Sequence, residues 1–332
     1  MADHSDFAGL IPDVIGRYGY WPTSEPEPVL SGTLNWNFKV GTDGGPFFVR
    51  RHRDDLETAR IQGEHALVAW AEARGVPAPL PEETPEGQTI IKMGTGRWSM
   101  YPWIDGELSV RGALTAQQVR TLGALHGFTQ ATLAKHPESA GQPLQMRWDK
   151  AQSVELLKRI ATVAAESGAD SELQVAVTNQ LKRLEAMEVL PPEAFATLPV
   201  QLIHGDFHDH QVLWQEDSIA ALVDWEIWHA DPRVWEVVRS LAFSQLLGGP
   251  LMEEYLLGYR DHVQLTEDEC RLGLRMWWQS RVVGVWAWAA YFLQGNTRVA
   301  RFFPEMIAES ERIADDGWTS GINERFVRAA CG

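Results

Sequence analysis

The sequence predicts an α+β protein with two lobes, a small one that combines strands with a helix and a larger one that is mainly helical. Residues 1–103 alternate between strand-like and helical patterns, whereas the chain after Trp103 is almost entirely helical. A chain of 332 residues is also longer than an ordinary single domain. We therefore expect an amino-terminal lobe over residues 1–103, a connecting segment at about 101–106, and a carboxy-terminal lobe over 104–332.

The strands of the small lobe are expected to begin at residues 36–40, where apolar and polar side chains alternate as on a half-buried strand. Residues 42–46 (Thr-Asp-Gly-Gly-Pro) are typical of a turn, so residues 47–50 should start the partner strand. A helix is expected over about 55–74, because the Gly-Val-Pro-Ala-Pro run after it stops helix growth. Two further strands are expected at residues 90–93 and 98–103.

The larger lobe has helical patterns at residues 114–135 and 148–187. Residues 200–223 interrupt them with two apolar runs of strand length around a polar, histidine-rich loop, and the chain beyond is helical again. Asp231 precedes a proline in a pattern typical of a helix start, with the aspartate as the cap. The aromatic segment 277–292 has apolar side chains on more than one face, which favours a buried helix over an aromatic wall beside a substrate.

Composition narrows the possible partners. With 29 basic and 45 acidic residues, the net charge is −16, which is unfavourable for nucleic-acid binding. Cys270 and Cys331 lie far apart in the sequence and have no metal-ligand spacing, so they indicate a reducing cytoplasm rather than a disulfide scaffold. The amino terminus lacks a signal-peptide pattern, and no uninterrupted apolar run is long enough to span a membrane. We expect a soluble cytoplasmic protein with no membrane partner, and the oligomeric state stays open.

Residues 201–226 carry the chemistry. An apolar strand leads into His204-Gly-Asp206, followed after four residues by Gln211, a second strand and then Asp224. Phosphoryl transfer needs one carboxylate to accept the proton of an attacking hydroxyl, and a second carboxylate with an amide oxygen to hold Mg²⁺. A hairpin between the two strands can bring both carboxylates to one point. The spacing therefore predicts Asp206 as the catalytic base, with Asp224 and Gln211 as metal ligands.

Residues 204–211, His-Gly-Asp-Phe-His-Asp-His-Gln, resemble the H-G-D-x-x-x-x-N catalytic loop of aminoglycoside phosphotransferases, choline kinases and related small-molecule kinases. Residues 223–226 resemble the metal-binding segment of that family, and residues 230–232 resemble its G-D-P step into the next helix. The resemblance covers about residues 29–242. It implies a protein-kinase-like bilobal fold and transfer of the γ-phosphoryl group of ATP, with Mg²⁺, to a hydroxyl of a small molecule.

The resemblance extends to residues that would bind the nucleotide. Residues 31–38 resemble the family's nucleotide loop, which makes Gly32 and Asn35 ATP-binding residues. The segment around Tyr101 and Trp103 resembles the linker whose backbone contacts the adenine.

Arg50 falls where the family has the basic residue that holds the α- and β-phosphates, and Glu64 on the following helix would be its ion-pair partner. The other interpretation of Arg50 is a solvated strand residue, because Arg51 and Arg53 lie beside it. Position 211 departs from the family, since glutamine replaces asparagine. Glutamine offers the same amide oxygen on a longer stem, which keeps metal binding feasible but can also weaken it.

The acceptor is open, because relatives phosphorylate aminoglycosides, choline or ethanolamine, homoserine, sugars and other alcohols. The acidic chain slightly favours an amine-bearing or sugar acceptor. In the family the acceptor site lies in the carboxy-terminal lobe, which makes Glu226, Trp228 and Glu236 candidate substrate-binding residues. Glu226 has two interpretations: it lines the substrate mouth beside the metal, or it faces water.

Two other classes of function compete with the kinase hypothesis. The first is a catalytically weak or inactive relative that binds nucleotide and acts through protein contacts. The second is a zinc hydrolase, suggested by the loop residues His204, His208, Asp209 and His210. No distant Cys/His cluster completes a ligand set for zinc, and the motif H-x-H-x-D-H is absent. In the kinase hypothesis, His204 braces the loop and binds no metal.

Overall fold

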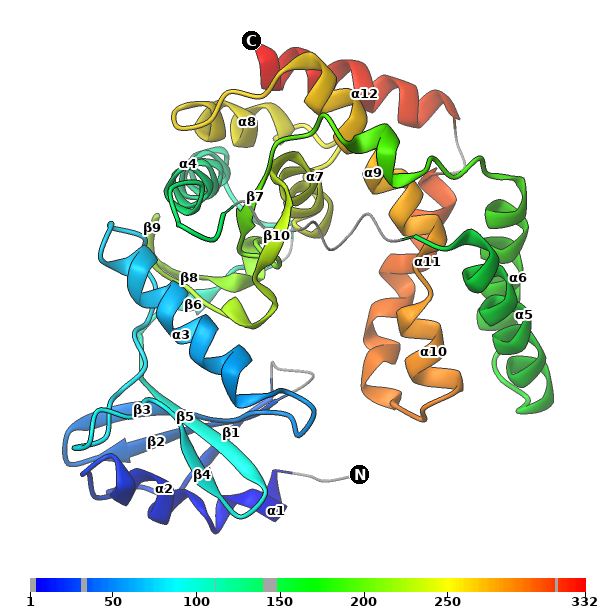
Figure 1. Ribbon diagram of the computed structural model, residues 1–332. Coiled ribbons are helices and arrows are strands. Elements are labelled where there is room, and N and C mark those ends of the chain that lie inside the picture. The colour runs from blue at the N-terminus through cyan, green and yellow to red at the C-terminus, as the bar shows by residue number, and fades with distance from the viewer. Residues whose placement is uncertain (1–3, 31–34, 111, 140–147, 314–315) are drawn as a thin grey trace. The chain divides into compact units, whose positions relative to one another are not determined.

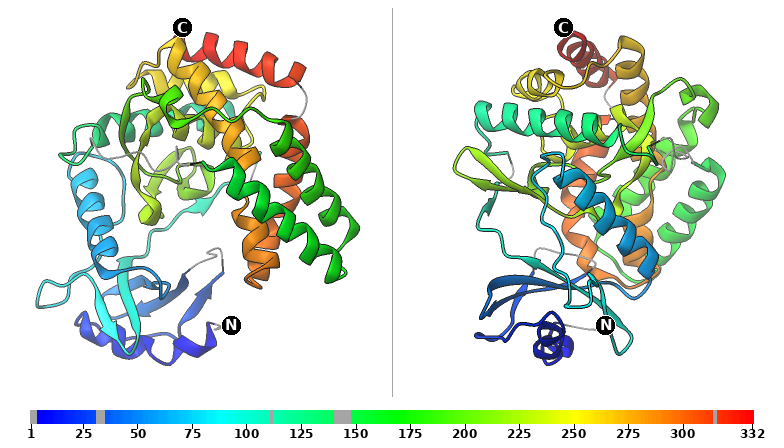
Figure 2. Two further views of the ribbon diagram at one scale, coloured as in Figure 1. Left: turned by 45° about the vertical axis from the view of Figure 1, so that its right-hand side comes forward. Right: turned by 60° about the vertical axis from the view of Figure 1, so that its left-hand side comes forward.

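The computed structural model describes residues 4–30, 35–110, 112–139, 148–313 and 316–332 (Figures 1 and 2). The chain divides into two compact units. The first comprises residues 1–121 and 204–228, and the second comprises residues 122–203 and 229–332. The histidine-rich loop and the segment that follows it thus group with the amino-terminal residues, whereas the sequence led us to expect them with the helical remainder of the chain.

A five-stranded antiparallel sheet, in the order β1-β2-β3-β5-β4, is the centre of the first unit. The loop between β2 and β3 has two residues, Asp43 and Gly44, and the next residue, Gly45, has φ +114°, which glycine adopts without strain. The strands are β1 (Glu27–Val29), β2 (Trp36–Thr42), β3 (Gly45–Arg51), β4 (Ile91–Met93) and β5 (Gly96–Pro102).

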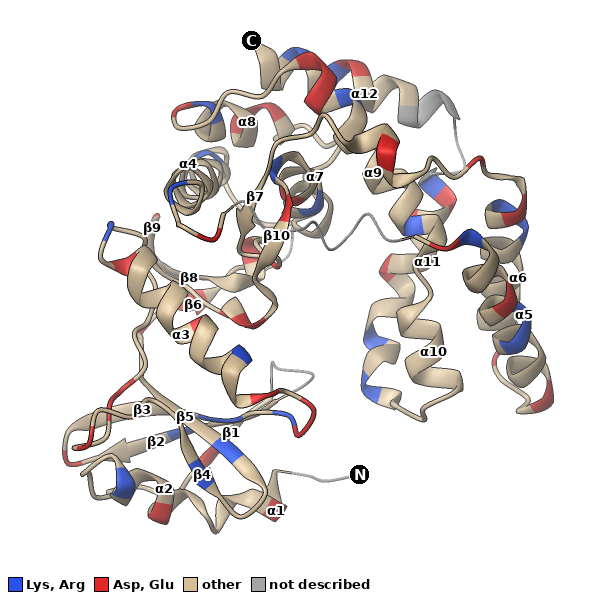
Figure 3. Ribbon diagram, in the orientation of Figure 1, with Lys and Arg blue, Asp and Glu red and all other residues tan. Residues whose placement is uncertain are grey.

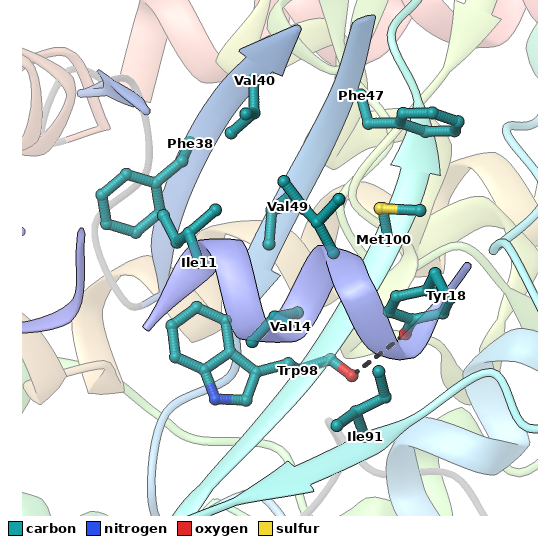
Figure 4. Close-up of a cluster of buried hydrophobic side chains, with 11 residues drawn as sticks. Ile11, Val14, Tyr18, Phe38, Val40, Phe47, Val49, Ile91, Trp98 and Met100 are labelled. Atoms are coloured by element: carbon teal, nitrogen blue, oxygen red, sulfur yellow. Dashed lines mark hydrogen bonds between the residues drawn. The ribbon is translucent and has the colours of Figure 1, made fainter. Parts of the chain in front are cut away.

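Two short helices, α1 (Ser5–Ala8) and α2 (Ile11–Arg17), precede the sheet, and α2 packs on it (Figure 4). The hydroxyl of Tyr18 donates to the carbonyl oxygen of Trp98 at 3.4 Å, which ties the end of this helix to β5. Burying such a set of apolar side chains supplies most of the local stability. The core includes Ile11, Val14, Ile15, Phe38, Val49, Trp98 and Met100, all fully buried.

The rest of the first unit is built from a helix and a small sheet. Helix α3 (Thr58–Glu72) follows β3. The small sheet has the order β6-β8-β9, with β6 (Glu107–Leu108), β8 (Val212–Gln215) and β9 (Ser218–Leu222). The turn between β8 and β9 contains Glu216 at φ +54°. The short helix η2 (Asp209–Gln211) precedes β8, and η3 (Trp225–Ile227) follows β9.

The second unit is mainly helical. Helices α5 and α6 lie side by side in all views and pack against α10 and the η4 segment in a second apolar core (Figures 1 and 2). Two strands, β7 (Val200–Ile203) and β10 (His229–Pro232), pair antiparallel. The helices are α4 (Ala116–Leu133, which begins in the first unit), α5 (Lys150–Glu166), α6 (Ser171–Ala186), η1 (Pro192–Phe195), α7 (Arg233–Phe243), α8 (Met252–Arg260), α9 (Glu267–Val283), α10 (Trp286–Phe292), η4 (Thr297–Phe302), α11 (Phe303–Ile313) and α12 (Asp316–Cys331).

The predicted fold class is confirmed: an antiparallel sheet with helices precedes a mainly helical carboxy-terminal region. Two predicted helices each prove to be a pair, because the chain breaks between α5 and α6 and again at Gly284 between α9 and α10. The aromatic segment is largely core, as expected, since Trp277 and Trp288 are buried, although Trp286 is 56% exposed. No helix in the described part of the chain is long and apolar enough to cross a membrane.

The predicted role of Asp231 as a helix cap is wrong. Helix α7 begins at Arg233, its N-cap is Pro232, and no side chain caps it. Asp231 instead lies in β10, fully buried, where its carboxylate is 3.2 Å from a ring nitrogen of His229. The pairing of β10 with β7 keeps the backbone extended through Pro232, so the helix starts later than the Asp-Pro pattern indicates.

Candidate active site

His204 joins the loop that carries Asp206 to the strand end that carries Asp224. The backbone N–H of Asp206 donates to His204 Nδ1 at 3.2 Å, which leaves the ring hydrogen on Nε2. That nitrogen donates to the carbonyl oxygen of Val223 at 3.1 Å. The backbone N–H of Val223 donates in turn to the carbonyl oxygen of Gln211 at 2.8 Å. These bonds hold the two acidic segments together within the first unit, and His204 braces the loop as expected.

The carboxylate of Asp206 is held from two sides. Gln211 Nε2 donates to its Oδ2 at 2.6 Å, and His208 Nε2 lies 3.7 Å from its Oδ1. A hydrogen bond to an ionised oxygen is stronger than a neutral one, so the amide restricts the orientation of this carboxylate. The side chain remains 20% exposed, so a small molecule can still reach it.

Asp224 has an unusual backbone conformation. Its φ of 65° and ψ of 60° lie in the left-handed region, where residues other than glycine are uncommon and aspartate is among the better tolerated. Such conformations cost free energy and concentrate at functional sites. Its side chain is 39% exposed, and one carboxylate oxygen lies 3.4 Å from an Arg50 guanidinium nitrogen.

Arg50 is buried in β3, and Nε donates to Asn37 Oδ1, on the neighbouring strand, at 3.2 Å. Burial alone would lower its pKa, but surrounding charges, of which Asp224 is the strongest, raise the pKa above its ordinary value. The interpretation of Arg50 as a solvated strand residue is wrong, because the side chain itself is buried, as is that of Arg51 beside it. Figure 3 shows basic positions along the strands of this sheet.

Glu64 in α3 is buried and acts on Arg50 through its charge. Burial, together with the negative charges of Glu226 and Asp224, raises its pKa from 4.5 to about 7, although Arg50 opposes the shift. Its Oε2 has no hydrogen-bond partner in the described part of the chain. The ion pair of Arg50 is made with Asp224, whereas the resemblance implied Glu64 as the partner.

Glu226 is buried and links the end of the predicted nucleotide loop to the segment after Asp224. Asn35 Nδ2 donates to one of its oxygens at 2.5 Å, and Arg53 Nε lies 3.1 Å from the other. Asn35 also accepts the backbone N–H of Arg53 through Oδ1 at 2.9 Å. The interpretation of Glu226 as a residue facing water is therefore wrong, since its side chain is only 4% exposed.

Arg60 fastens the same segment to α3. Its guanidinium donates to the carbonyl oxygens of Glu226, at 3.0 Å, and Trp228, and lies 4.2 Å from the centre of the Trp228 ring. A Cβ added to Gly63 would lie 2.9 Å from this indole. Arg53, Arg60 and Asn37 are not among the site residues predicted from the sequence. The density of arginines after β3 could have indicated Arg53 and Arg60, although their partner Glu226 lies far away in the chain.

The other residues predicted to bind the nucleotide lie in the segment before β2 and at the end of β5. Gly32 lies outside the described residues, and Asn35 is the first described residue after that gap. Tyr101 is buried in β5, with its hydroxyl 2.9 Å from His65 Nε2. The backbone N–H of Trp103 donates to the carbonyl oxygen of Pro46 at 3.0 Å. Because that N–H is engaged, an adenine at this linker would contact the Trp103 carbonyl or the backbone beyond it.

Glu236 is fully buried within the second unit. Its carboxylate lies 3.1 Å from His126 Nε2 and accepts a hydrogen bond from Gln130 Nε2 at 3.0 Å. Tyr259 donates to the other end of the Gln130 amide at 2.6 Å, so the glutamate belongs to a buried polar network. No part of the Glu236 side chain is open to an acceptor in this structure.

The remaining loop residues hold the loop in shape. Asp209 is buried and accepts a hydrogen bond from the Ser109 hydroxyl at 3.1 Å. Burial would raise its pKa, but His208, His210 and Ser109 outweigh burial and lower it. Within the described ranges, no group of three or more His, Cys, Asp or Glu side chains could hold a metal ion.

The residues around Asp206 nevertheless suit Mg²⁺. This ion prefers oxygen ligands and uses one or two carboxylates together with substrate phosphates and water, so it needs no cluster of three acidic side chains. Asp224 offers a partly exposed carboxylate, and Gln211 keeps an amide oxygen after its nitrogen has bonded Asp206. Phosphoryl transfer needs a cation for the phosphates as well as a carboxylate for the metal ion, and Arg50 lies 3.4 Å from Asp224.

The kinase-type loop and the sheet-plus-helix architecture define the class of a small-molecule phosphotransferase. The chain belongs to the phosphotransferase enzyme family (APH), whose model matches residues 25–272. A search of curated proteins found no significant match.

Several solved structures share the fold at low sequence identity. Amicoumacin kinase, solved with AMP-PNP and Ca²⁺, is 14% identical with a TM-score of 0.61, covering 92% of this chain and 94% of that one. An aminoglycoside phosphotransferase from Alicyclobacillus acidocaldarius is 13% identical with a TM-score of 0.62, covering 96% and 97%. A microcompartment-associated aminopropanol kinase is 15% identical with a TM-score of 0.61, covering 95% and 98%. These likenesses confirm the predicted kinase-like fold.

Proposed function

We propose that the protein transfers the γ-phosphoryl group of ATP to a hydroxyl group of a small molecule. The observation that carries this proposal is the hydrogen-bond chain from Asp206 through His204 to Val223, beside the contact between Arg50 and Asp224. These contacts gather a candidate base, a candidate metal ligand and a phosphate-binding cation in one unit of the chain.

In this proposal Asp206 accepts the proton of the acceptor hydroxyl as the phosphoryl group moves in line. Gln211 orients the accepting carboxylate through its amide nitrogen. Asp224 and the amide oxygen of Gln211 would hold Mg²⁺, which neutralises charge on the phosphates when bound. Arg50 would exchange its contact with Asp224 for the α- and β-phosphates, because a guanidinium donates well to phosphate oxygens.

The nucleotide would be held by the amino-terminal residues of the first unit. Gly32 and Asn35 belong to the proposed phosphate loop, and the backbone at Tyr101 and Trp103 would contact the adenine. Glu64 would stabilise the positive charge of Arg50 once Asp224 is occupied by metal. The nucleotide analogue bound to amicoumacin kinase, which shares the fold, supports ATP as the donor.

For the phosphate acceptor we propose only a chemical class, namely an amine-bearing, amino-alcohol or sugar compound. A net charge of −16 favours the approach of cationic molecules. The carboxylate of Glu226 already contacts Asn35 and Arg53. We therefore assign it a role in holding the site together and not in binding the acceptor. Of the three candidate acceptor residues, Trp228 alone is partly exposed and could contact an acceptor.

The test is ATP consumption with and without Mg²⁺ across a panel of hydroxyl compounds, comparing the wild type with Asp206→Asn. We expect at least one acceptor to stimulate ADP release in the wild type. The variant should lose turnover by about 1000-fold while it still binds ATP with similar affinity, since it keeps the shape of the side chain but not its basicity. Undiminished ADP release by the variant would reject Asp206 as the base.

A nucleotide-binding protein with little or no catalysis is the second candidate. It is motivated by one observation: Gln211 replaces the asparagine of the family, and its longer side chain can weaken metal binding. This alternative predicts that ATP raises the melting temperature although no acceptor in the panel stimulates ADP release. Any acceptor-dependent turnover that requires Asp206 excludes it.

A further inference from the structure

The two cysteines of the chain meet in the second unit, although they are 61 positions apart. Cys270 lies in the first turns of α9 and is fully buried, and Cys331 is the last residue of α12 and is partly exposed. Their sulfur atoms are 3.8 Å apart. The sequence indicated two isolated cysteines, and only the packing of α12 against α9 reveals them as a pair.

Packing and polar contacts fix helix α12 against its neighbours, so the fold itself brings the two cysteines together. Its buried side chains recur at helical spacing along one face, so that face packs against α8 and α9. Arg325 forms a bidentate ion pair with Glu253 of α8, in which Nε donates to Oε1 and Nη2 donates to Oε2, each at 3.1 Å. Trp278 of α9 donates to Asn323 at 3.4 Å. Among the described side chains of α12, the buried apolar ones are Ile322, Phe326, Val327 and Ala330.

We propose that Cys270 and Cys331 are a reversible modification site, at which a low-molecular-weight disulfide oxidises them to an intrachain disulfide that fastens α12 to α9. A disulfide needs the sulfurs at about 2.05 Å. The remaining approach of less than 2 Å is within reach of a side-chain rotation combined with a small shift of the last turn of α12, which is the end of a helix. The inference is independent of the proposed phosphotransfer.

The exposure of the two thiols sets the order of the reaction. Cys331 is the thiol that solvent reaches, so its thiolate attacks the small disulfide, forms a mixed disulfide and releases one small thiol. Cys270 then loses its proton to water and attacks the Cys331 sulfur. The protein disulfide forms, and the second small thiol leaves. The two protein thiols are oxidised, and one small disulfide is reduced to two thiols.

Burial makes Cys270 a slow partner until Cys331 is activated. Burial, Cys331 and the neighbouring Glu269 and Glu267 all raise the pKa of the Cys270 thiol far above its usual value, so little thiolate is present. Direct attack of Cys270 on a small disulfide in solution is therefore disfavoured. Within the mixed disulfide, by contrast, the target sulfur lies beside Cys270.

The experiment equilibrates the folded full-length protein with reduced and oxidised glutathione at graded ratios. Samples are then denatured with an alkylating agent, and intact mass and peptides are measured. We expect the oxidised wild type to lose two hydrogens, to take up no alkylating agent, and to give a linked peptide pair containing Cys270 and Cys331. Cys270→Ala should retain one glutathione on Cys331. Cys331→Ser should keep Cys270 as a free thiol.

A second measurement keeps the inference testable if a variant folds poorly. The cross-link closes a loop of 61 residues in the unfolded chain, so the oxidised wild type should melt roughly 5 °C higher than the reduced form. Dithiothreitol should reverse the shift, and Cys331→Ser should melt at the same temperature under both conditions. Wild type that stops at the mixed disulfide, dimers linked between chains, or oxidation without a higher melting temperature would each overturn the inference.

Discussion

The side-chain amide of Gln211 donates to a carboxylate oxygen of Asp206 at 2.6 Å. A carboxylate can only accept, so the amide must present its nitrogen to Asp206, which leaves the amide oxygen for a cation. At the scale of single residues, Gln211 would serve both the base and the metal site in the proposed mechanism, and the two functions can be separated by mutation.

Gln211→Glu replaces the amide nitrogen by a second carboxylate oxygen. Two carboxylates at hydrogen-bond distance share a proton, so Asp206 becomes a poorer base at neutral pH. We expect kcat to fall about 10-fold to 100-fold, without a rise in the Mg²⁺ concentration needed for half-maximal activity. Steady-state kinetics at graded Mg²⁺ measure both quantities. Gln117→Glu, at an exposed position, is the matched control, and an unchanged kcat in Gln211→Glu would count against the orienting role.

The left-handed backbone of Asp224 can be tested apart from its charge. Asp224→Ala and Asp224→Gly both remove the carboxylate, but only alanine has a Cβ that is strained at φ 65°. We expect both variants to lose activity, with the glycine variant more stable than the alanine variant by about 1 kcal/mol after the larger entropy of unfolded glycine is included. Urea denaturation measures the difference. Equal stability, or greater stability of the alanine variant, would mean that the conformation is not strained.

At the scale of elements, sequence periodicity predicted the long helices and the strands around the two hairpins, because their burial repeats regularly. It did not predict β6, which has two residues, or β10, whose His-Ala-Asp-Pro has weak strand preference and is extended by pairing with β7. The candidate site likewise contains residues that the sequence predicts and residues that only the three-dimensional contacts reveal. Asp206, Gln211 and Asp224 follow from local spacing, whereas the burial of Glu226 depends on arginines that are distant in sequence.

Gly63 permits the close contact between α3 and Trp228. In most helices Gly→Ala stabilises, but here the added Cβ would lie 2.9 Å from the indole. We expect Gly63→Ala to lower the free energy of unfolding by about 1 to 3 kcal/mol. Gly16→Ala in α2, where the added Cβ meets nothing within 4 Å, should be neutral or stabilising.

A smaller ring at position 228 provides the complementary test. In the Gly63→Ala background, Trp228→Phe removes the ring atom that the new methyl group would meet, so it should recover part of the lost stability. Chemical denaturation of the two single variants and the double variant gives this coupling. Purely additive losses would show that α3 does not rest on this indole.

The ion pair of Arg53 and Glu226 should be worth more than an exposed pair. Glu226 is 4% exposed and Arg53 is 31% exposed, so solvent screens their attraction only in part. In a double-mutant cycle with Arg53→Met and Glu226→Gln, we expect a coupling of about 1 to 2 kcal/mol in the free energy of unfolding. Lys158 and Glu185, also an ion pair but about half exposed, are the matched control and should couple by less than about 0.5 kcal/mol. Equal coupling energies for the two pairs would mean that burial does not strengthen the ion pair of Arg53 and Glu226.

At the scale of the whole molecule, the residues that we propose for nucleotide, metal and catalysis group in one unit that is discontinuous in sequence. Periodicity cannot reveal this, because the grouping comes from contacts between residues 204–228 and the amino-terminal sheet and α3. The unit also concentrates buried charge: Arg50, Glu64 and Glu226 are all nearly inaccessible. The stability of the protein should therefore depend on pH in a way that its net charge alone does not explain.

The pKa of Glu64 predicts the direction in which stability changes with pH. Its pKa is about 7 in the folded protein and 4.5 without the surroundings, so between these values the folded state binds a proton that the unfolded state has released. Stability from this group is complete below pH 4.5 and is lost as the pH rises through 7. Glu64→Gln mimics the neutral form and escapes the loss. Relative to wild type, the variant should gain about 3 kcal/mol between pH 4.5 and 8.

Urea denaturation of both proteins across that range measures the difference, and the comparison cancels the general repulsion expected at a net charge of −16. Glu72→Gln, at the exposed end of the same helix, is the matched control and should follow the wild type at every pH. A constant offset between Glu64→Gln and wild type would mean that Glu64 is already ionised at pH 5. In that case Arg50 holds Glu64 as a charged partner in the free protein.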